Sequence, residues 1–279
     1  MLLHKFPKSR LMDVNMFWIG KALGPIEAAS MRSFLQSGHR VNLFTYGEVE
    51  GVPKEVSRHE ASALLPWGKA RNLRYGKNGS YALAADYFRL KLQREGLGFW
   101  SDADMICLRP IALSGDYIAG RQDDEFINNA FFYMDRHHPL LTELLDLFER
   151  DDIPEWLRIK AWSRFKIRLH VLAGRPLASM MPWGTHGVTA FTKLSKKLGV
   201  EPLAPAAFYP LHYRDAEKLL DPAFDVDSVI TPQSYALHLW NEVIKKHPSY
   251  SKPPSGSSLD KLLIRFGEET SRNSAIANV

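Results

Sequence analysis

The stretch YALAADYFRLKLQREGLGFWSDADMICLRPI, residues 81–111, decides the fold of this chain. Apolar residues recur at helical spacing from 81 to 94, so this part is predicted to be a helix with one buried face. Gly96 and Gly98 follow it, and glycine commonly ends a helix in the left-handed conformation. Residues 97–100 are few and mostly apolar, which predicts a short buried strand.

An acidic turn follows this strand and places Asp102 and Asp104 two residues apart. In an extended chain such residues point to the same side, so the two carboxylates are predicted to converge. Like charges held this close repel each other unless a cation lies between them. Mn²⁺ or Mg²⁺, which take oxygen ligands, would fit the pair. The alternative is a solvated acidic turn that binds nothing.

The composition is that of an ordinary soluble globular protein. The 279 residues are 45% hydrophobic and 24% charged, enough for a substantial core. No apolar run has the length of a membrane span, and basic residues interrupt residues 1–15, so no signal peptide is predicted. A single cysteine, Cys107, excludes an internal disulfide and favours a reducing, cytoplasmic setting. The net charge of +5 suits a nucleotide, an acidic polymer or an anionic membrane, whereas no motif for nucleic acid is present.

Strand and helix patterns alternate at the start of the chain. Residues 14–20 and 41–46 read as strands, with a helix over 26–35 between them. This order with short joints begins a parallel α/β sheet. Residues 51–79 show little periodicity and are predicted to form a basic loop, either a lid over a site or a solvated surface loop.

Further elements are predicted along the rest of the chain. Strands are expected at 116–120, 126–133 and 235–241, and helices at 139–150, at 154–173 and after 183–189 as far as Leu198. Residues 248–258 have the composition of a linker, and 259–266 have the pattern of a short amphipathic helix. That helix would dock on the domain, on a partner or on a membrane. Residues 1–247 are therefore predicted to be one domain, and 248–279 a linker with a tail.

The sequences ADYFR (residues 85–89) and GLGFWSDAD (residues 96–104) together resemble the DXD region of nucleotide-sugar glycosyltransferases with the GT-A fold. The resemblance is to the sugar-binding DXD family that includes α-1,4-glycosyltransferases, initiation-type mannosyltransferases and bacterial polysaccharide glycosyltransferases. The family's second glycine is displaced to Gly98, and an aromatic residue, Phe99 or Trp100, stands for its tyrosine. The resemblance implies a single α/β domain with a Rossmann-type mixed sheet flanked by helices.

The resemblance also implies roles for residues on the helix and at the ends of the first strands. Asp86 and Arg89 would hold the hydroxyls of the donor sugar, the alternative being a surface ion pair three residues apart. The nucleotide would lie near Trp18, Ile19 and Tyr46, because ligands of such folds lie at the carboxyl ends of the strands. For Trp18 and Tyr46 plain core packing is an equal alternative.

Other candidate residues lie nearer the C-terminus. Asn129 would contact a sugar or satisfy the backbone at a strand bend. Related GT-A enzymes carry a His-x-x-Trp or His-x-Trp segment that completes the metal site, which implies His238 as the third ligand, after Asp102 and Asp104, and Trp240 as a donor contact. Imidazole suits Mn²⁺ better than Mg²⁺, and a core histidine is the alternative. His186 is predicted to be a helix cap or a surface residue, the alternative being a catalytic acid or base.

The function that the resemblance implies is metal-dependent sugar transfer. A hexose or N-acetylhexosamine would move from a UDP-sugar, or from a GDP-sugar, to a glycan or glycolipid with retention of the α configuration. Synthesis of bacterial-type polysaccharide or lipopolysaccharide, at the inner face of a membrane, would fit a basic chain without a span. Two other functions stay open: a catalytically silent domain that binds nucleotide or glycan, and a phosphohydrolase that uses the same carboxylates.

Overall fold

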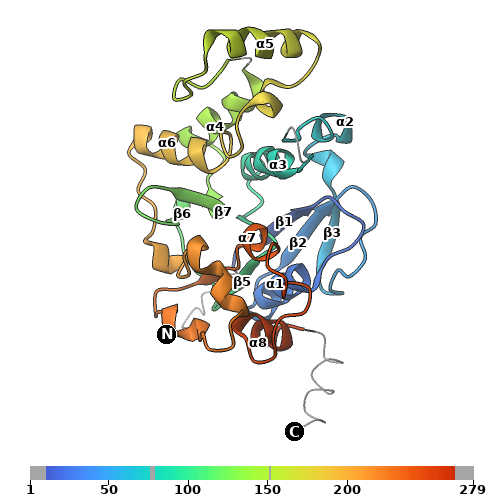
Figure 1. Cartoon of the computed structure of the whole chain (residues 1–279), viewed down its shortest axis with the longest axis vertical. Helices are drawn as coiled ribbons and strands as arrows, with labels where there is room; N and C mark the ends of the chain where they lie inside the picture. Colours follow the sequence, from blue (N-terminus) through green and yellow to red (C-terminus); the bar gives the residue numbers. More distant parts are fainter. Residues whose placement is uncertain (1–10, 76–78, 151, 268–279) are drawn as a thin grey trace, which may run out of the picture.

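A six-stranded mixed sheet forms the centre of the molecule in the computed structural model, which describes residues 11–75, 79–150 and 152–267 (Figure 1). In spatial order its strands are β3 (Ser57–Glu60), β2 (Val41–Thr45), β1 (Val14–Trp18), β4 (Phe99–Ser101), β7 (Ile127–Met134) and β6 (Tyr117–Arg121). The first four are parallel, and β7 and β6 pair antiparallel to their neighbours. The predicted mixed sheet with flanking helices is confirmed.

Both faces of the sheet are covered, because alternate side chains of a strand point to opposite sides. Val14 and Met16 of β1 belong to one hydrophobic cluster, and Phe17 belongs to the other. The first cluster includes side chains of α1 (Pro25–Gln36) and α8 (Ser258–Arg265). The second includes those of α3 (Ala82–Arg94), α4 (Pro139–Glu149) and α6 (Val188–Leu198). The core therefore lies in two layers, one on each side of the sheet (Figure 1).

A second, two-stranded sheet joins distant parts of the chain. Strand β5 (Met105–Cys107) follows the acidic turn and pairs antiparallel with β8 (Ala236–His238). The register places Met105 opposite His238. This pairing brings the C-terminal part of the chain to the end of β4.

Two glycines shape the joint between α3 and β4. Gly96 has a φ of 69°, and its N–H donates to the carbonyl of Gln93 at 2.9 Å, which is the predicted left-handed end of the helix. Gly98 has a φ of 106°, and a Cβ there would lie 2.5 Å from the carbonyl oxygen of Asp13. Only glycine lets the chain pass this close to the start of β1.

Three predicted elements differ from the structure. The helix expected at 154–173 is α5 (Ala161–Leu172), because the chain before it makes a turn in which Leu157 N–H donates to Pro154. The basic loop contains β3, the short 3₁₀ helix η1 (Ala61–Ala63) and α2 (Trp67–Ala70), which are too short to show a period in sequence. The last strand ends at His238 and is followed by α7 (Asn241–Ile244), since Trp240 takes a left-handed φ of 57°.

The C-terminal helix α8 packs on the domain. Leu259, Leu262 and Phe266 are buried in the same cluster as α1, and Ser257 caps the helix at Asp260 N–H. Of the three surfaces considered for this helix, the domain is thus the one it contacts. Residues 1–10, 76–78 of the basic loop, 151 and 268–279 of the tail lie outside the described residues. Within the described part, no helix has both the length and the apolar character needed to cross a membrane.

Candidate active site

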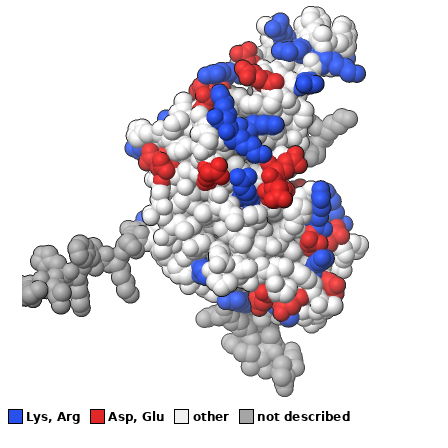
Figure 2. All heavy atoms as spheres, turned by 90° about the vertical axis from the view of Figure 1, so that its left-hand side faces the viewer, with Lys and Arg blue, Asp and Glu red and all other residues white. Residues whose placement is uncertain are grey.

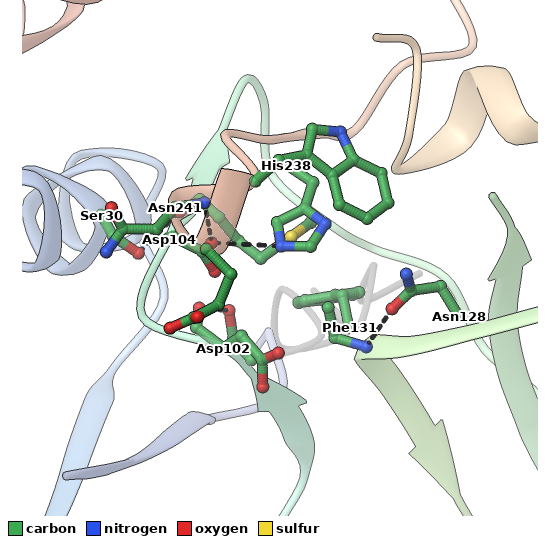
Figure 3. Close-up of polar contacts among 12 residues, drawn as sticks. Ser30, Asp102, Asp104, Asn128, Phe131, His238 and Asn241 are labelled. Atoms are coloured by element: carbon green, nitrogen blue, oxygen red, sulfur yellow. Dashed lines mark hydrogen bonds and ion pairs between the residues drawn. The ribbon is translucent and has the colours of Figure 1, made fainter. Parts of the chain in front are cut away.

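The acidic turn lies at the carboxyl edge of the parallel strands. Residues 103 and 104 form a tight turn between β4 and β5, so the two aspartates converge through the turn and not through an extended chain as predicted. Asp102, Asp104 and His238 each offer one ligand atom, and these atoms lie within 4.8 Å of one another. Figure 3 shows Asp104 joined to His238, with Asp102 beside it.

His238 is held in place by its strand and by an aromatic neighbour. Its position opposite Met105 puts the imidazole beside Asp104, with Nε2 3.2 Å from the carboxylate. The ring of Trp240 packs against it with centroids 4.0 Å apart. Nδ1 is buried and makes no hydrogen bond within the described part of the chain. The polar partner of this buried imidazole is therefore the carboxylate of Asp104.

Asp104 is the more strongly anionic carboxylate of the turn. It accepts a hydrogen bond from the backbone N–H of Asn241 at 2.9 Å (Figure 3). Asn241 in turn donates its side-chain amide to Glu27 at 3.0 Å. Burial alone would raise the pKa of Asp104, but His238 and hydrogen bonds from the backbone of Asn241 and of Asp104 itself outweigh it, and the pKa is lowered. Burial and the nearby Asp104 raise the pKa of Glu27.

Arg89 lies at the centre of the site and is buried. Its guanidinium is 3.1 Å from Asp102 and 3.6 Å from Asp86, and it donates to the carbonyl of Asn129 at 2.5 Å. The same group lies over the ring of Trp100, 4.7 Å from the centroid. The indole N–H of Trp100 donates to Asp102 at 2.8 Å. Arg89 and Trp100 together fix the direction of the Asp102 carboxylate.

Two of the carboxylates are costly to ionise. Burial raises the pKa of Asp102 to about 6, with Asp104 adding to the rise and Arg89 and His238 opposing it. Burial also raises the pKa of Asp86, while Arg89 and the amide of Asn129, which donates at 3.1 Å, oppose the rise. A bound cation would favour the charged form of Asp102.

The donor set fits a divalent cation. Two carboxylates and one imidazole suit Mn²⁺ better than Mg²⁺. The side chain of Asp102 is 31% exposed, so the cluster is open to solvent on one side. Elsewhere among the described residues, no other group of three or more His, Cys, Asp or Glu side chains gathers in this way.

The residues predicted to contact the nucleotide divide into two groups. Trp18 ends β1, and Ile19 and Tyr46 directly follow β1 and β2. These strands are adjacent and parallel, so the three residues share a sheet edge with Asp102. The indole of Trp18 donates to Ala22 and the hydroxyl of Tyr46 donates to Leu65, so both polar ends bind protein. Trp240 is buried behind His238 and donates to the carbonyl of Leu211 at 2.8 Å. It supports the imidazole from behind.

Sequence reasoning missed three residues of the site. Asn241 and Glu27 form the hydrogen-bonded support of Asp104 described above. Gly187 lies against Asp86, because a Cβ there would be 2.8 Å from the carboxylate. In the sequence, Asn241 is marked only by its place after Leu-Trp, and Gly187 only by its place before an apolar helix. Neither position reveals a partner that lies far away in sequence.

The prediction that His186 is a cap or surface residue is wrong. Its side chain is buried against Phe148, with ring centroids 4.9 Å apart. Burial lowers its pKa to about 4. The turn from Pro182 to Gly187 folds back on itself before α6 begins, which carries His186 into the core layer formed by α4 and α6.

Comparison with known protein families finds a match in the C-terminal part of the chain. Residues 183–270 match a family model described as the alpha 1,4-glycosyltransferase conserved region. The matched segment contains Gly187, His238, Asn241 and helix α8. No curated protein matches the chain. The match supports an enzyme that transfers sugars, related to the α-1,4-glycosyltransferases.

Proposed function

We propose that the protein moves a hexose or N-acetylhexosamine from a nucleotide-sugar to a glycan or glycolipid, and that the reaction depends on a divalent metal. A UDP-sugar is the favoured donor and a GDP-sugar the second candidate. The observation that carries this proposal is the cluster of Asp102, Asp104 and His238, whose ligand atoms lie within 4.8 Å of one another in a glycosyltransferase. Its place at the carboxyl edge of the strands is where α/β sheets bind nucleotides.

In this proposal Asp104 and His238 would hold the cation directly, and Asp102 would contact the ribose and the cation. A divalent cation held by these residues would supply positive charge that stabilises the departing diphosphate. Asp104 suits this role because its pKa is lowered and it is anionic at neutral pH. Asn241 holds the carboxylate in position through its backbone N–H.

Asp86, Arg89 and Asn129 would orient the donor sugar. Their contacts with one another leave Asp86 anchored by two partners, so a free oxygen of the carboxylate can accept from a sugar hydroxyl. Fixing the sugar fixes its anomeric carbon beside an acceptor hydroxyl. We propose front-face attack, with retention of the α configuration.

The proposed setting is the synthesis of bacterial-type polysaccharide or lipopolysaccharide in the cytoplasm, with the enzyme bound peripherally at the inner face of a membrane. A net charge of +5 supports contact with an anionic surface.

A thermal-shift screen tests donor and metal together. Full-length protein is heated with UDP, GDP and their sugars, each with and without Mn²⁺. We expect the largest rise in Tm with a UDP-sugar and Mn²⁺, and loss of that rise in Asp104→Asn. Asp116→Asn, an exposed carboxylate at the start of β6, is the matched control and should respond like the wild type. Equal shifts in all three proteins would reject the site.

A second assay separates an enzyme from a silent binding domain. Release of UDP from UDP-sugars is followed with Mn²⁺, after EDTA, and after Mn²⁺ is restored. We expect slow release that stops with EDTA and returns with Mn²⁺. Binding of Mn²⁺ and UDP without any release or transfer would instead favour a scaffold, and hydrolysis of phosphodiesters without a nucleotide-sugar would favour a phosphohydrolase.

A further inference from the structure

Helix α5 lies at one end of the molecule (Figure 1). It exposes an apolar face. Trp162, Phe165, Leu169 and Leu172 are 67%, 53%, 50% and 84% exposed. Their spacing of three, four and three residues puts them on one side of the helix. The side chain of Ile167 is buried on the opposite side, against the segment around Leu177. The apolar face thus points away from the domain.

Basic side chains flank this face. Over the whole stretch from residue 156 to 200 the sequence contains no aspartate or glutamate. Its lysines and arginines near α5 are all exposed: Arg158, Lys160, Arg164, Lys166, Arg168 and Arg175. None of these six forms an ion pair with an acidic residue in the described part of the chain. Figure 2 shows this end of the molecule, where lysine and arginine gather around uncharged side chains.

The aromatic, aliphatic and basic side chains of α5 together suit a lipid surface. A tryptophan and a phenylalanine that stack on each other, with centroids 5.9 Å apart, beside aliphatic and basic side chains, match the layered chemistry of a bilayer surface. Apolar side chains enter the acyl boundary, aromatic rings lie at headgroup level, and lysine and arginine meet anionic headgroups. A folded protein partner would need acidic side chains around an apolar groove. This requirement is narrower than that of an anionic bilayer, which offers an apolar interior and anionic headgroups everywhere.

We propose that α5 docks the enzyme on an anionic lipid bilayer, with Trp162, Phe165, Leu169 and Leu172 inserted and the flanking basic residues on the headgroups. The inference deepens the peripheral membrane association proposed above by naming its surface. It also excludes the C-terminal helix α8 as the anchor, since the apolar face of α8 is buried in the core. Its test uses no sugar transfer, so it can fail while the proposed chemistry stands.

Vesicle flotation with the full chain tests the proposal. The probes are vesicles of phosphatidylcholine alone and of phosphatidylcholine with phosphatidylglycerol, at low and high salt. We expect the protein to float with the anionic vesicles, to stay largely unbound with the neutral ones, and to be released by salt. Equal binding to both, or binding to neither, would overturn the proposal.

Two variants locate the surface. Arg164→Gln/Lys166→Gln/Arg168→Gln should lower partitioning by on the order of 100-fold, from the loss of three headgroup attractions. Trp162→Ser/Phe165→Ser/Leu169→Ser should lower it by about tenfold or more, from the loss of apolar insertion. The matched controls are Lys21→Gln/Lys54→Gln/Lys246→Gln and Leu97→Ser/Leu203→Ser/Ile264→Ser, which change exposed residues elsewhere and should float like the wild type.

Two outcomes of the flotation experiment would contradict the proposal. If both α5 variants float like the wild type, the anchor lies elsewhere. If sedimentation shows a wild-type dimer that the apolar variant lacks, while no protein floats, then α5 is a surface between two copies. Circular dichroism checks that each variant is folded, which is expected because the changed side chains are exposed.

Discussion

Arg89 is the residue on which the geometry of the site depends most. One buried guanidinium serves Asp102, Asp86 and the carbonyl of Asn129. Because both carboxylates are partly or fully buried, their negative charges rely on this partner. A sequence motif identifies Asp86 and Arg89 as neighbours on a helix, but it does not reveal that Arg89 also reaches across to the acidic turn.

Replacing Arg89 with methionine should destabilise the fold. The substitution leaves the buried Asp86 and the partly exposed Asp102 without this partner, which costs about 3 kcal/mol of unfolding free energy. Urea denaturation at neutral pH measures the loss. The control is Arg58→Met, whose partner Glu48 is at the surface, so little change is expected there. A similar result for both variants would contradict the role given to Arg89.

Gly187→Ala should impair the site with little loss of stability. The new Cβ would lie 2.8 Å from the carboxylate of Asp86, which is held by Arg89 and Asn129 and must shift. We expect KM for the donor to rise by about tenfold, the equivalent of one lost hydrogen bond to a charged group. Steady-state kinetics give the value, and Gly68→Ala, whose Cβ meets open space, should leave KM unchanged. An unchanged KM in Gly187→Ala would show that Asp86 does not contact the donor.

His186 should make stability fall in mild acid. Its pKa in the folded protein is about 4, below the ordinary 6.5. Between these two pH values the imidazole is therefore protonated in the unfolded chain but neutral in the folded protein. The stabilisation is complete above pH 6.5 and is lost as the pH falls toward 4. From pH 7.5 to 5 the loss is about 2 kcal/mol.

The role of His186 is tested by comparing the acid-induced loss of stability among three proteins. Denaturation is measured at pH 7.5 and 5 for the wild type, for His186→Leu and for the exposed His137→Leu. We expect the acid loss to shrink in His186→Leu and to persist in His137→Leu. Equal losses in all three would show that other groups cause the pH dependence.

Among the elements, the pairing of β5 with β8 builds the cluster. The acidic turn directly follows β4. Strand β8, which is far away in sequence, pairs with β5 and places His238 opposite Met105. The helix α3, the first strands and the left-handed end at Gly96 could be predicted, because periodicity and glycine are local signals. The partners of Asn241 and Gly187 could not, since register between distant segments leaves no local pattern.

Short elements, the start of helix α5 and the burial of His186 are also features that the sequence does not predict correctly. The segment from 51 to 79 folds into β3, η1 and α2, each of three or four residues, so no window of sequence shows a period. Helix α5 was expected seven residues too early, because a turn at Pro154 precedes it. The environment of His186 was missed because burial depends on which layer the following helix joins.

Gly98→Ala should destabilise the joint between α3 and β4. Its φ of 106° is unfavourable for alanine, and the Cβ would lie 2.5 Å from the carbonyl of Asp13. We expect the unfolding free energy to fall by more than about 1 kcal/mol in thermal or urea denaturation. Gly96→Asn is the matched control, because asparagine tolerates the left-handed φ of 69° and the nearest atoms belong to the flexible side chain of Arg136. Equal stability of the two variants would contradict this account of the joint.

At the scale of the whole molecule, three separate segments contribute to one edge of the sheet. Helix α3 supplies Asp86 and Arg89, the turn after β4 supplies Asp102 and Asp104, and β8 supplies His238. Only the last lies in the segment that matches the glycosyltransferase family model. The central claim is that these segments together hold a cation for the donor diphosphate.

Anomalous diffraction from crystals grown with Mn²⁺ and UDP tests that claim most directly. Data on either side of the manganese absorption edge locate the ion without reference to any expected ligand. The account predicts one strong peak bounded by Asp102, Asp104 and His238, with the diphosphate against it, and no such peak in Asp104→Asn. A peak bound to other side chains, or UDP bound with no peak at this cluster, would contradict it.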